Sequence, residues 1–377
     1  MRTVLNLKRY KGNPILGPME ELPWANREAR NPGVAFDGGK FHLLFTARCR
    51  AHTGLPYSED GGIYLGYASS GDGVHFDVSS EPFLKPDPEL DSFDHAHVED
   101  ARITCMEGRY YISYMGRSYN DLLFARGKRR RGPDGNMAPT WSENFRRGGF
   151  AWTSDWKSVT RLGPCTSEHV SDANMVLFPE KVNGKYAILH RPTFYIPWIL
   201  PAFYHRSSIW IAFNDSLGPL SSDLDAMPWE YEDSRDVPDD HLLIESKFDW
   251  EWMKVGASGV PIPTDDGWLM TYHGVDRRGV YRVGLMLLDR ENPLRVISRS
   301  PLPILQPEAD YEQLGEEQFH RDFYYPHCVF PCANLLIGDE IWIYYGAGDK
   351  YCCLATMKFR EAMDYLHTGD CRSAANN

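Results

Sequence analysis

The sequence contains no apolar run close to the roughly 18 residues that a membrane-spanning helix needs. Residues 1–16 also lack an apolar core of signal-peptide length. Cysteine is scarce, with 8 among 377 residues and no paired CxxC units, which argues against a disulfide scaffold and against a typical zinc site. We therefore expect a cytoplasmic protein with reduced thiols, without membrane association and without bound metal.

Positive charge is also in short supply. The chain has 40 Lys and Arg against 52 Asp and Glu, a formal net charge of −12, whereas a nucleic-acid partner requires a basic face. The basic run RGKRRR, residues 126–131, lies among Gly, Pro and Asn and is typical of a solvated loop. A contact between copies in a homo-oligomer and an anionic ligand are the alternatives for this run, and no nucleic-acid partner is expected.

Aromatic residues, by contrast, are abundant at 13%, including 11 Trp and 21 Tyr. Aromatic side chains favour β-strands, and they also form stacking surfaces for sugars. Five segments share one pattern, a turn with Gly or Asp followed by an alternating, aromatic-rich strand. Because a second β-like run precedes each of them, each segment predicts a β-hairpin. The segments are FDGGKFHLLFTA (36–47), MEGRYYISYMG (106–116), VNGKYAILHRP (182–192), TDDGWLMTYHG (264–274) and IGDEIWIYYGA (337–347).

Three or four strands in each of five units, with almost no helical periodicity, predict an all-β fold, a five-bladed β-propeller. The N-terminal segment 10–18 is expected to add a strand to the last blade and close the ring. Residues 1–377 would form one catalytic domain, with a peripheral C-terminal tail from about 360 to 377. A two-sheet β-sandwich is the alternative. The further strands that follow the hairpins are expected at 61–70, 207–216, 281–289 and 350–359.

Polar side chains recur at matching places in the opening strands and their flanks. The inner strands of a propeller converge on a central channel, so polar groups that are distant in sequence meet there. Each has a structural interpretation as well: Arg191 as a rim salt bridge, Lys254 as a turn cap, His273 as a core histidine. Recurrence in several units favours a functional site. The candidates are Asp100 with its neighbours Glu99 and Arg102, then Asn174, Arg191, Lys254, His273 and Asp349.

Six motifs follow one another along the chain from about residue 13 to residue 359. They are NPGVAFDGGKFHLLF, EDARI, MVLFPEKVNGKYAILHRP, KVGASGVPI, TYHGV and FPCANLLIGDEIWIYYGAGD. Together they resemble glycoside hydrolase family 130, the family of β-mannoside phosphorylases and β-mannosidases on a five-bladed propeller. No single motif carries the resemblance alone.

The resemblance implies an inverting reaction in which Asp100, in the EDAR motif, is the general acid. The proton would move towards the glycosidic oxygen, in several family members through the 3-hydroxyl of the mannose. Glu99 and Arg102 would tune or position the acid. Asn174 is implied as a polar neighbour in the substrate site, and Asp349 as a sugar-binding carboxylate. The phosphate-site positions of the family fall on Arg191, Lys254 and His273.

Two positions depart from the family pattern. Phosphorylases of the family often carry a basic residue where this chain has Ala173, and an Arg where it has Thr46, although Arg48 or Arg50 could substitute for the latter. These losses weaken the case for phosphate. The three retained phosphate-site residues still favour it, because the family's hydrolases tend to lose the basic cluster and gain carboxylates. Glu180 is such a carboxylate to consider.

We predict an enzyme, a glycosyltransferase-type phosphorylase (EC 2.4.1.-) acting on β-1,2- or β-1,4-manno-oligosaccharides or a mannosyl-glucose. Inorganic phosphate is its co-substrate, α-mannose 1-phosphate its product, and no cofactor is expected. Phosphate is already an anionic nucleophile, so the site needs cations and donors to hold it. An inverting β-mannosidase (EC 3.2.1.-) and a non-catalytic carbohydrate-binding propeller are the alternatives. His205 and Arg206 lie in an aromatic loop that could reach the aglycone or the anion.

Overall fold

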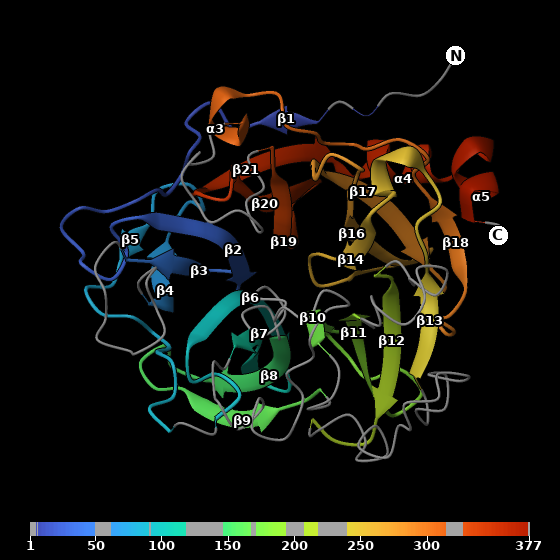
Figure 1. The fold of residues 1–377 in the computed structure, drawn as a ribbon. Coiled ribbons are helices and arrows are strands. Elements are labelled where there is room, and N and C mark those ends of the chain that lie inside the picture. The colour runs from blue at the N-terminus through green and yellow to red at the C-terminus, as the bar shows by residue number, and fades with distance from the viewer. Residues whose placement is uncertain are drawn as a thin grey trace, which may run out of the picture.

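The computed structural model describes residues 5, 7–49, 62–89, 92–117, 146–166, 171–193, 207–217, 240–313 and 327–375. The basic run 126–131, His205 and Arg206 lie outside these residues. The described chain is an all-β protein whose strands form sheets arranged around a common centre (Figure 1). Within the same residues, no helix has both the length and the apolar character needed to span a membrane.

The largest sheet contains eight strands and falls into two halves. We call β2 to β5 unit 1 and β6 to β9 unit 2. Antiparallel pairs connect the strands inside each half, whereas one parallel residue pair, Ile63 with His97, joins β4 to β6. The strands are β2 (Glu28–Phe36), β3 (Phe41–Arg48), β4 (Ile63–Ser70), β5 (Asp77–Val78), β6 (His97–Met106), β7 (Arg109–Arg117), β8 (Arg146–Thr153) and β9 (Thr160–Pro164).

The other three sheets are antiparallel and follow one another in the chain. Unit 3 contains β10 (Ser171–Leu177), β11 (Tyr186–Thr193), β12 (Ile209–Asn214) and β13 (Asp240–Ile244). Unit 4 contains β14 (Lys254–Ala257), β15 (Ile262–Thr264), β16 (Gly267–Val275), β17 (Tyr281–Leu288) and β18 (Val296–Arg299), preceded by a 3-10 turn at Asp249–Glu251. Unit 5 contains β19 (Val329–Ile337), β20 (Glu340–Ala347), β21 (Tyr351–Lys358) and the N-terminal β1 (Lys8–Arg9).

All five hairpins predicted from the sequence are confirmed, as β2–β3, β6–β7, β10–β11, β15–β16 and β19–β20. The four further strands expected after the hairpins are β4, β12, β17 and β21. The N-terminal segment also pairs with the last sheet, where Lys8 lies opposite Thr356 and the Ile15 amide donates to the Cys352 carbonyl at 2.9 Å. The outer strands β5, β8, β9, β13 and β18 were not anticipated.

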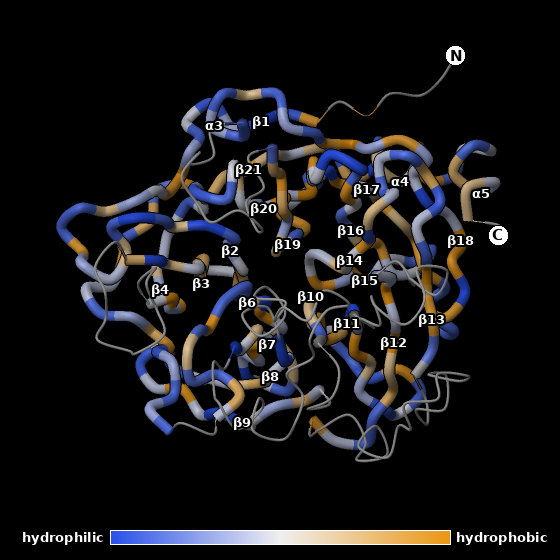
Figure 2. The backbone as a smooth tube through the Cα atoms, viewed as in Figure 1, coloured by the Kyte–Doolittle hydropathy of each residue, from blue (hydrophilic) through white to orange (hydrophobic). Residues whose placement is uncertain are grey.

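Apolar clusters fill the spaces between successive units, and hydrophobic stretches concentrate on the strands (Figure 2). Leu44 and Leu65 of unit 1 pack with Ile103 and Ile112 of unit 2, so the two halves of the eight-stranded sheet face each other. Equivalent clusters join units 2 and 3, units 3 and 4, and units 4 and 5. A further cluster, which includes Val34 and Tyr344, joins unit 5 back to unit 1.

The inner strands approach one another closely around the centre, where β2, β6, β10, β14 and β19 lie (Figure 1). A Cβ on Gly33 of β2 would stand 2.3 Å from the carbonyl oxygen of Ala101 on β6. A Cβ on Gly259, after β14, would stand 1.8 Å from the side-chain oxygen of Asn334 on β19. Glycine is therefore required at both contacts, because only a residue without a side chain leaves room for the neighbouring strand.

The C-terminal residues form two helices at the outer edge of units 4 and 5, α4 (Phe359–Leu366) and α5 (Gly369–Ala375) (Figure 1). One side of these helices is buried against the sheets. Met363 and Leu366 join a cluster with Leu285 on β17 and Ile343 on β20. Residues 360–375 thus lie at the outer edge of the fold, and their apolar side chains pack into the core.

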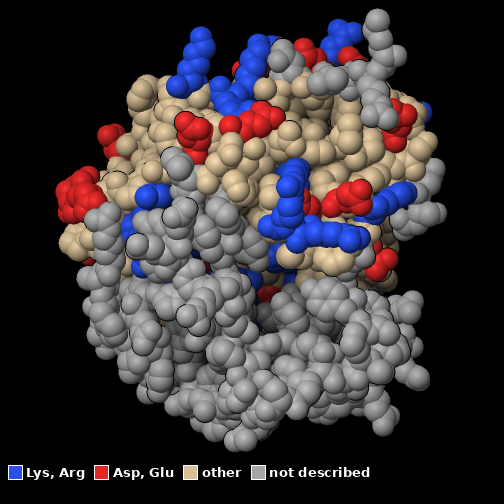
Figure 3. Space-filling model, turned by 45° about the horizontal axis from the view of Figure 1, so that its top comes forward, with Lys and Arg blue, Asp and Glu red and all other residues tan. Residues whose placement is uncertain are grey.

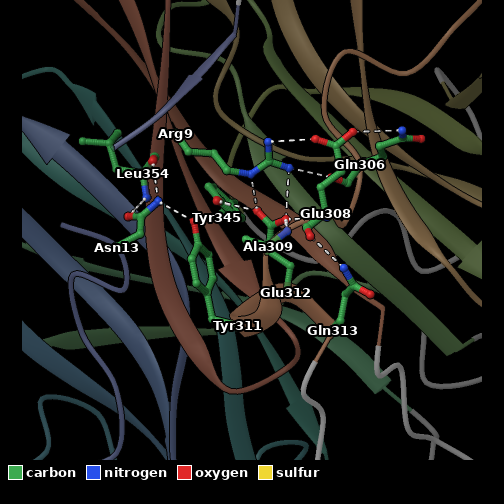
Figure 4. A network of polar contacts seen from close by, with 10 residues as sticks. All are labelled: Arg9, Asn13, Gln306, Glu308, Ala309, Tyr311, Glu312, Gln313, Tyr345 and Leu354. Atoms are coloured by element: carbon green, nitrogen blue, oxygen red, sulfur yellow. Dashed lines mark hydrogen bonds and ion pairs between the residues drawn. The ribbon is translucent and has the colours of Figure 1, made fainter. Parts of the chain in front are cut away.

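A buried carboxylate ties the start of the chain to unit 5 (Figure 4). Glu312 lies in the short helix α3 (Asp310–Gln313) and has no exposed surface. Its oxygens accept hydrogen bonds from Arg9 Nε at 2.8 Å and from Tyr345 Oη at 2.8 Å. They also accept the main-chain amides of Glu308 at 2.7 Å and Ala309 at 2.9 Å. The carboxylate therefore satisfies donors from three separate parts of the chain.

Replacing Glu312 by Ala should lower the free energy of unfolding by about 3 kcal/mol. The substitution removes the carboxylate that accepts hydrogen bonds from the buried Tyr345 hydroxyl and from the Arg9 guanidinium. Denaturant unfolding measures this change. Glu308 provides the control: it also pairs with Arg9, at 3.2 Å, but its side chain is 59% exposed. Glu308→Ala should cost less than about 1 kcal/mol. Equal losses in the two variants would contradict this account.

Candidate functional site

Three inner strands carry an irregularity at equivalent positions. The register of β2 shifts between Arg30 and Gly33, and β6 and β10 shift at the matching places. At each shift one residue adopts the left-handed backbone conformation: Asn31 with φ 53°, Asp100 with φ 57° and Asn174 with φ 57°. Asn and Asp tolerate this conformation better than other side chains. A bulge redirects its side chain out of the regular pleat, so the three units present related polar groups near the centre.

Asp100 is buried, with 8% of its surface exposed, and unit 1 holds it from two sides. Asn31 Nδ2 donates a hydrogen bond to Asp100 Oδ1 at 2.7 Å. The main-chain amide of Asp100 donates to Thr46 Oγ1 at 2.9 Å. Thr46, which stands where the family often has an Arg, therefore anchors the backbone of the bulge.

Arg102 is fully buried and connects two parts of the site. Its Nη1 donates to the main-chain oxygen of Asp100 at 2.6 Å, and its Nε donates to the main-chain oxygen of Ser258 at 3.1 Å. The guanidinium also lies 5.4 Å from the centre of the Phe330 ring. The charges at the head of β6 are thus interior groups, since Glu99 is only 2% exposed.

Glu99 belongs to a buried chain of alternating charges beside Asp100. It accepts a hydrogen bond from Arg117 Nε at 2.5 Å and lies 3.6 Å from Arg30 Nη2. Burial would raise the pKa of Glu99, but the guanidinium charges of Arg117 and Arg30 outweigh it and lower the pKa to about 2. Arg30 in turn donates to Glu28 at 2.9 Å and to Asp349 at 2.9 Å.

Asp349 follows β20 and has the same left-handed backbone as the three bulge residues, with φ 56°. Burial raises the pKa of its carboxyl group, while the charge of Arg30 opposes that rise. Arg30 therefore holds Glu99 and Asp349 on either side of one guanidinium. This arrangement brings Glu99, Asp100 and Asp349 into one acidic region, which we call the acid side of the site.

His273 is the centre of the opposite, basic side. It is fully buried, and Arg191 Nη1 lies 3.1 Å from its Nε2. An arginine can only donate, so Nε2 accepts and the ring proton belongs on Nδ1, which lies 3.1 Å from Ser258 Oγ. Burial, followed by the charges of Arg191, Lys254 and Arg102, holds the pKa of His273 well below its usual value. The imidazole is neutral and orients Arg191.

Arg191 is also fixed through its backbone. Its amide donates to Asp172 Oδ1 at 3.0 Å, and the same oxygen accepts the amide of Ala173 at 2.8 Å. The other oxygen of Asp172 contacts His190 Nδ1 at 2.7 Å. Lys254 Nζ lies 5.0 Å from the centre of the Tyr281 ring.

Asn174 reaches the basic side across Gly256. A Cβ on Gly256 would stand 2.5 Å from His273 Nε2 and 2.6 Å from Asn174 Oδ1. The absence of a side chain at Gly256 thus lets the amide and the imidazole lie close together. Arg191, Lys254, His273 and Asn174 form one group, and the Arg102–Ser258 contact joins it to the acid side.

Several residues of the site escaped the sequence analysis: Asn31, Arg30, Asp172 and Ser258. Alignment of the bulges offers the signal, because RNPG, EDAR and ANMV then occupy equivalent places in units 1, 2 and 3. Glu180 lies elsewhere: it is exposed at the surface and pairs with Arg290. Arg48 lies beside the acid side, where it pairs with Glu28 at 3.4 Å. Arg50 is outside the described residues.

The charged groups of the site differ from those at the surface. Acidic and basic side chains are interspersed on the face seen in Figure 3, and such exposed pairs contribute little to stability. The site charges are buried or half-buried: carboxylates alternate with guanidinium groups on the acid side, whereas Arg191 and Lys254 act on His273 on the basic side. In the described ranges, no three His, Cys, Asp or Glu side chains gather as metal ligands would.

The lowered pKa of Glu99 predicts a pH-dependent contribution to stability. The contribution is complete above the unfolded-state value of about 4.5 and is lost as the pH falls towards about 2, because the unfolded chain binds the proton first. Glu99→Gln should therefore weaken the dependence of the unfolding free energy on pH in that window. Denaturant unfolding at several pH values tests this, and an unchanged slope would contradict the assignment.

Comparisons with known proteins agree along nearly the whole chain. The sequence model of glycoside hydrolase family 130, described as beta-1,4-mannooligosaccharide phosphorylase, matches residues 27–368. The chain is 32% identical over 360 residues to a 1,2-beta-oligomannan phosphorylase of Thermoanaerobacter sp., covering 95% of this chain and 99% of the relative. It is 31% identical over 359 residues to a beta-1,2-mannobiose phosphorylase of the same organism, covering 94% and 98%.

The fold has matching solved structures. The beta-1,2-mannobiose phosphorylase from Listeria innocua, in complex with beta-1,2-mannobiose, matches with a TM-score of 0.74 and 24% identity, over 96% of this chain and 99% of that one. At this identity the likeness shows the fold alone. The family match and the two relatives above 30% identity show that the chain belongs to glycoside hydrolase family 130.

Proposed function

We propose that this protein is an inverting phosphorylase that cleaves β-mannosides with inorganic phosphate and releases α-mannose 1-phosphate. The observation that carries the proposal is the basic side of the site. The charged groups that act on the buried, neutral His273 are all cations: Arg191, Lys254 and Arg102. Fixed cations and hydrogen-bond donors of this kind favour the binding of an anion, and phosphate is the anion that a phosphorylase uses as nucleophile.

We also propose that the described sheets form the blades of one five-bladed β-propeller, within a single domain of residues 1–377. Three observations support it. The eight-stranded sheet divides at a single residue pair into two halves that pack face to face. Apolar clusters join each unit to the next and unit 5 to unit 1. The N-terminal strand pairs within the last sheet, as ring closure requires.

In the proposed mechanism, Asp100 supplies the proton that the leaving glycosidic oxygen takes up. A phosphate held by Arg191 and Lys254 attacks the anomeric carbon from the opposite face. The bond from that carbon to the glycosidic oxygen breaks as the bond to a phosphate oxygen forms, which inverts the anomeric configuration. His273 and Asn174 position the side chains of the basic side. Arg102 fixes the distance between the basic side and Asp100.

Asp349 and Glu99 have supporting roles in this proposal. An inverting hydrolase needs a second carboxylate to activate water. Asp349 pairs with Arg30 at 2.9 Å, and we assign it to binding sugar hydroxyls and not to activating water. Glu99 is engaged by Arg117 and keeps Arg30 in place. Because the relatives at 31–32% identity are named for β-1,2 linkages, we propose β-1,2-mannosides as the first substrates to test.

The remaining sequence expectations stay predictions: no cofactor besides phosphate, a cytoplasmic location and the homo-oligomer alternative for residues 126–131. A hydrolase and a non-catalytic binding protein are the alternative functions.

Incubation of the protein with β-1,2-mannobiose should give α-mannose 1-phosphate only when phosphate is present, and β-1,4-mannobiose tests the alternative linkage. Chromatography of the products measures α-mannose 1-phosphate and free mannose. Asp100→Asn should reduce the rate by roughly 10²–10⁴-fold, the usual contribution of a general acid, while sugar binding is retained. Free mannose released without phosphate would identify a hydrolase instead, and binding without turnover by the wild type would identify a binding protein.

Arg191→Gln should raise the KM for phosphate roughly 10–100-fold, because a charge-assisted hydrogen bond is worth about 1.5–3 kcal/mol. The KM for the mannoside should change little. Arg109→Gln is the matched control, since Arg109 is an exposed arginine that stacks on Trp152 at 4.3 Å on the outer part of unit 2. Steady-state kinetics with varied phosphate concentration measures these KM values. The same KM for phosphate in both variants would contradict the assignment.

A further inference from the structure

We propose that Asn31 is the positioning residue for the general acid: it keeps the catalytic proton on Oδ2 of Asp100. This inference rests on the proposed function of Asp100. The Asn31 amide donates to Asp100 Oδ1 at 2.7 Å, and both residues are buried, with 2% and 8% of their surfaces exposed. A buried donor at this distance engages one carboxylate oxygen and leaves the other for the substrate.

The backbone of unit 1 and a neighbouring strand position the Asn31 side chain. Its left-handed conformation, with φ 53°, comes from the bulge in β2. The side chain also lies against β20, because a Cβ on Gly346 would stand 2.0 Å from Asn31 Oδ1. Rotation of the amide by a half-turn would place Oδ1 against the Asp100 carboxylate, acceptor against acceptor, so the hydrogen-bond network assigns the orientation with Nδ2 towards Asp100.

This contact decides where the acidic proton resides. The carbonyl oxygen of a protonated carboxyl group is a better acceptor than its hydroxyl oxygen. Because Nδ2 occupies Oδ1, the favoured arrangement of protonated Asp100 carries its hydrogen on Oδ2. Thr46 adds a second restraint by accepting the Asp100 amide at 2.9 Å. Unit 1 thus orients the acid that unit 2 carries, through one contact to the side chain and one to the backbone.

Other titratable groups also act on Asp100, and they come from several elements. Arg30 on β2 and Asp349 after β20 interact with it electrostatically, as does the Cys332 thiol on β19. Glu99 and Arg102 flank it on β6, where Arg102 contacts its main-chain oxygen. Asn31→Gly alters none of these charged groups, so a pH effect of that substitution reports the lost amide.

Two substitutions remove the amide donor. Asn31→Gly keeps the left-handed backbone, which glycine adopts without strain, and adds no charge. Asn31→Asp has the same shape as Asn but cannot donate when ionised, and its negative charge also repels the Asp100 carboxylate. Without the donor the charged Asp100 carboxylate is less stabilised, so Asp100 should hold its proton to higher pH. The alkaline limb of the kcat profile should move up by about one pH unit in Asn31→Gly and further in Asn31→Asp. The kcat at the optimum should fall about tenfold while the KM for β-1,2-mannobiose changes less than about threefold.

The control is Asn183→Gly, which removes the side chain of another left-handed asparagine, with φ 50°, in the exposed turn between β10 and β11. Its pH profile should match the wild type. Carboxyl ¹³C NMR titration, assigned with Asp100→Asn, reads the same displacement without turnover and therefore applies even if phosphate proves dispensable. An Asp100 titration at the wild-type pH in folded Asn31→Gly or Asn31→Asp would overturn the proposal. A displacement confined to Asn31→Asp would report the added charge and would also overturn the proposal.

Discussion

The site depends on one buried guanidinium that is held by main-chain dipoles. Arg102 has no exposed surface and donates to the carbonyl groups of Asp100 and Ser258, which belong to units 2 and 4. Burial of a charge is costly unless hydrogen bonds compensate for it. Here the bonds engage Nε and Nη1 of the guanidinium, and they connect the acid side of the site to the basic side. Because neutral carbonyl oxygens accept these bonds, Arg102 keeps its full charge and adds to the potential around His273.

The two sides of the site differ in how their charges are balanced. On the acid side, Glu28, Glu99 and Asp349 surround Arg30, so carboxylates and a guanidinium balance within a few ångströms. On the basic side, Arg191 faces an uncharged imidazole, and the Asp172 carboxylate accepts the Arg191 main-chain amide at 3.0 Å. Burial suppresses the charge of His273, and Arg191 can then approach a lone pair in place of a second cation. In the proposed function, this region receives the phosphate.

The repeated hairpins were predictable because each combines a turn signal with strict alternation, and all five occur where the sequence placed them. The outer strands β5, β9 and β18 are short and weakly patterned, which explains why they were missed. In the site, the residues next to recognisable motifs were found. Asn31 and Thr46 were not assigned roles, because their importance arises from bulges that bring separate hairpins into contact. The charge of His273 was also beyond sequence reasoning, since burial and its cationic neighbours determine it.

The pairing of β1 with β21 has a kinetic consequence. Lys8 lies beside Thr356, more than 300 residues away along the chain. Nearly the whole polypeptide must therefore be synthesised and leave the ribosome before the last sheet acquires its outer strand. Pairings this remote in sequence form slowly, because the chain must first close a very long loop. Until then the edge of β21 is an open template for other strands. Completion of the last sheet is thus expected to be a late step in the maturation of the enzyme, and the interval before it is the period of greatest exposure to misassembly.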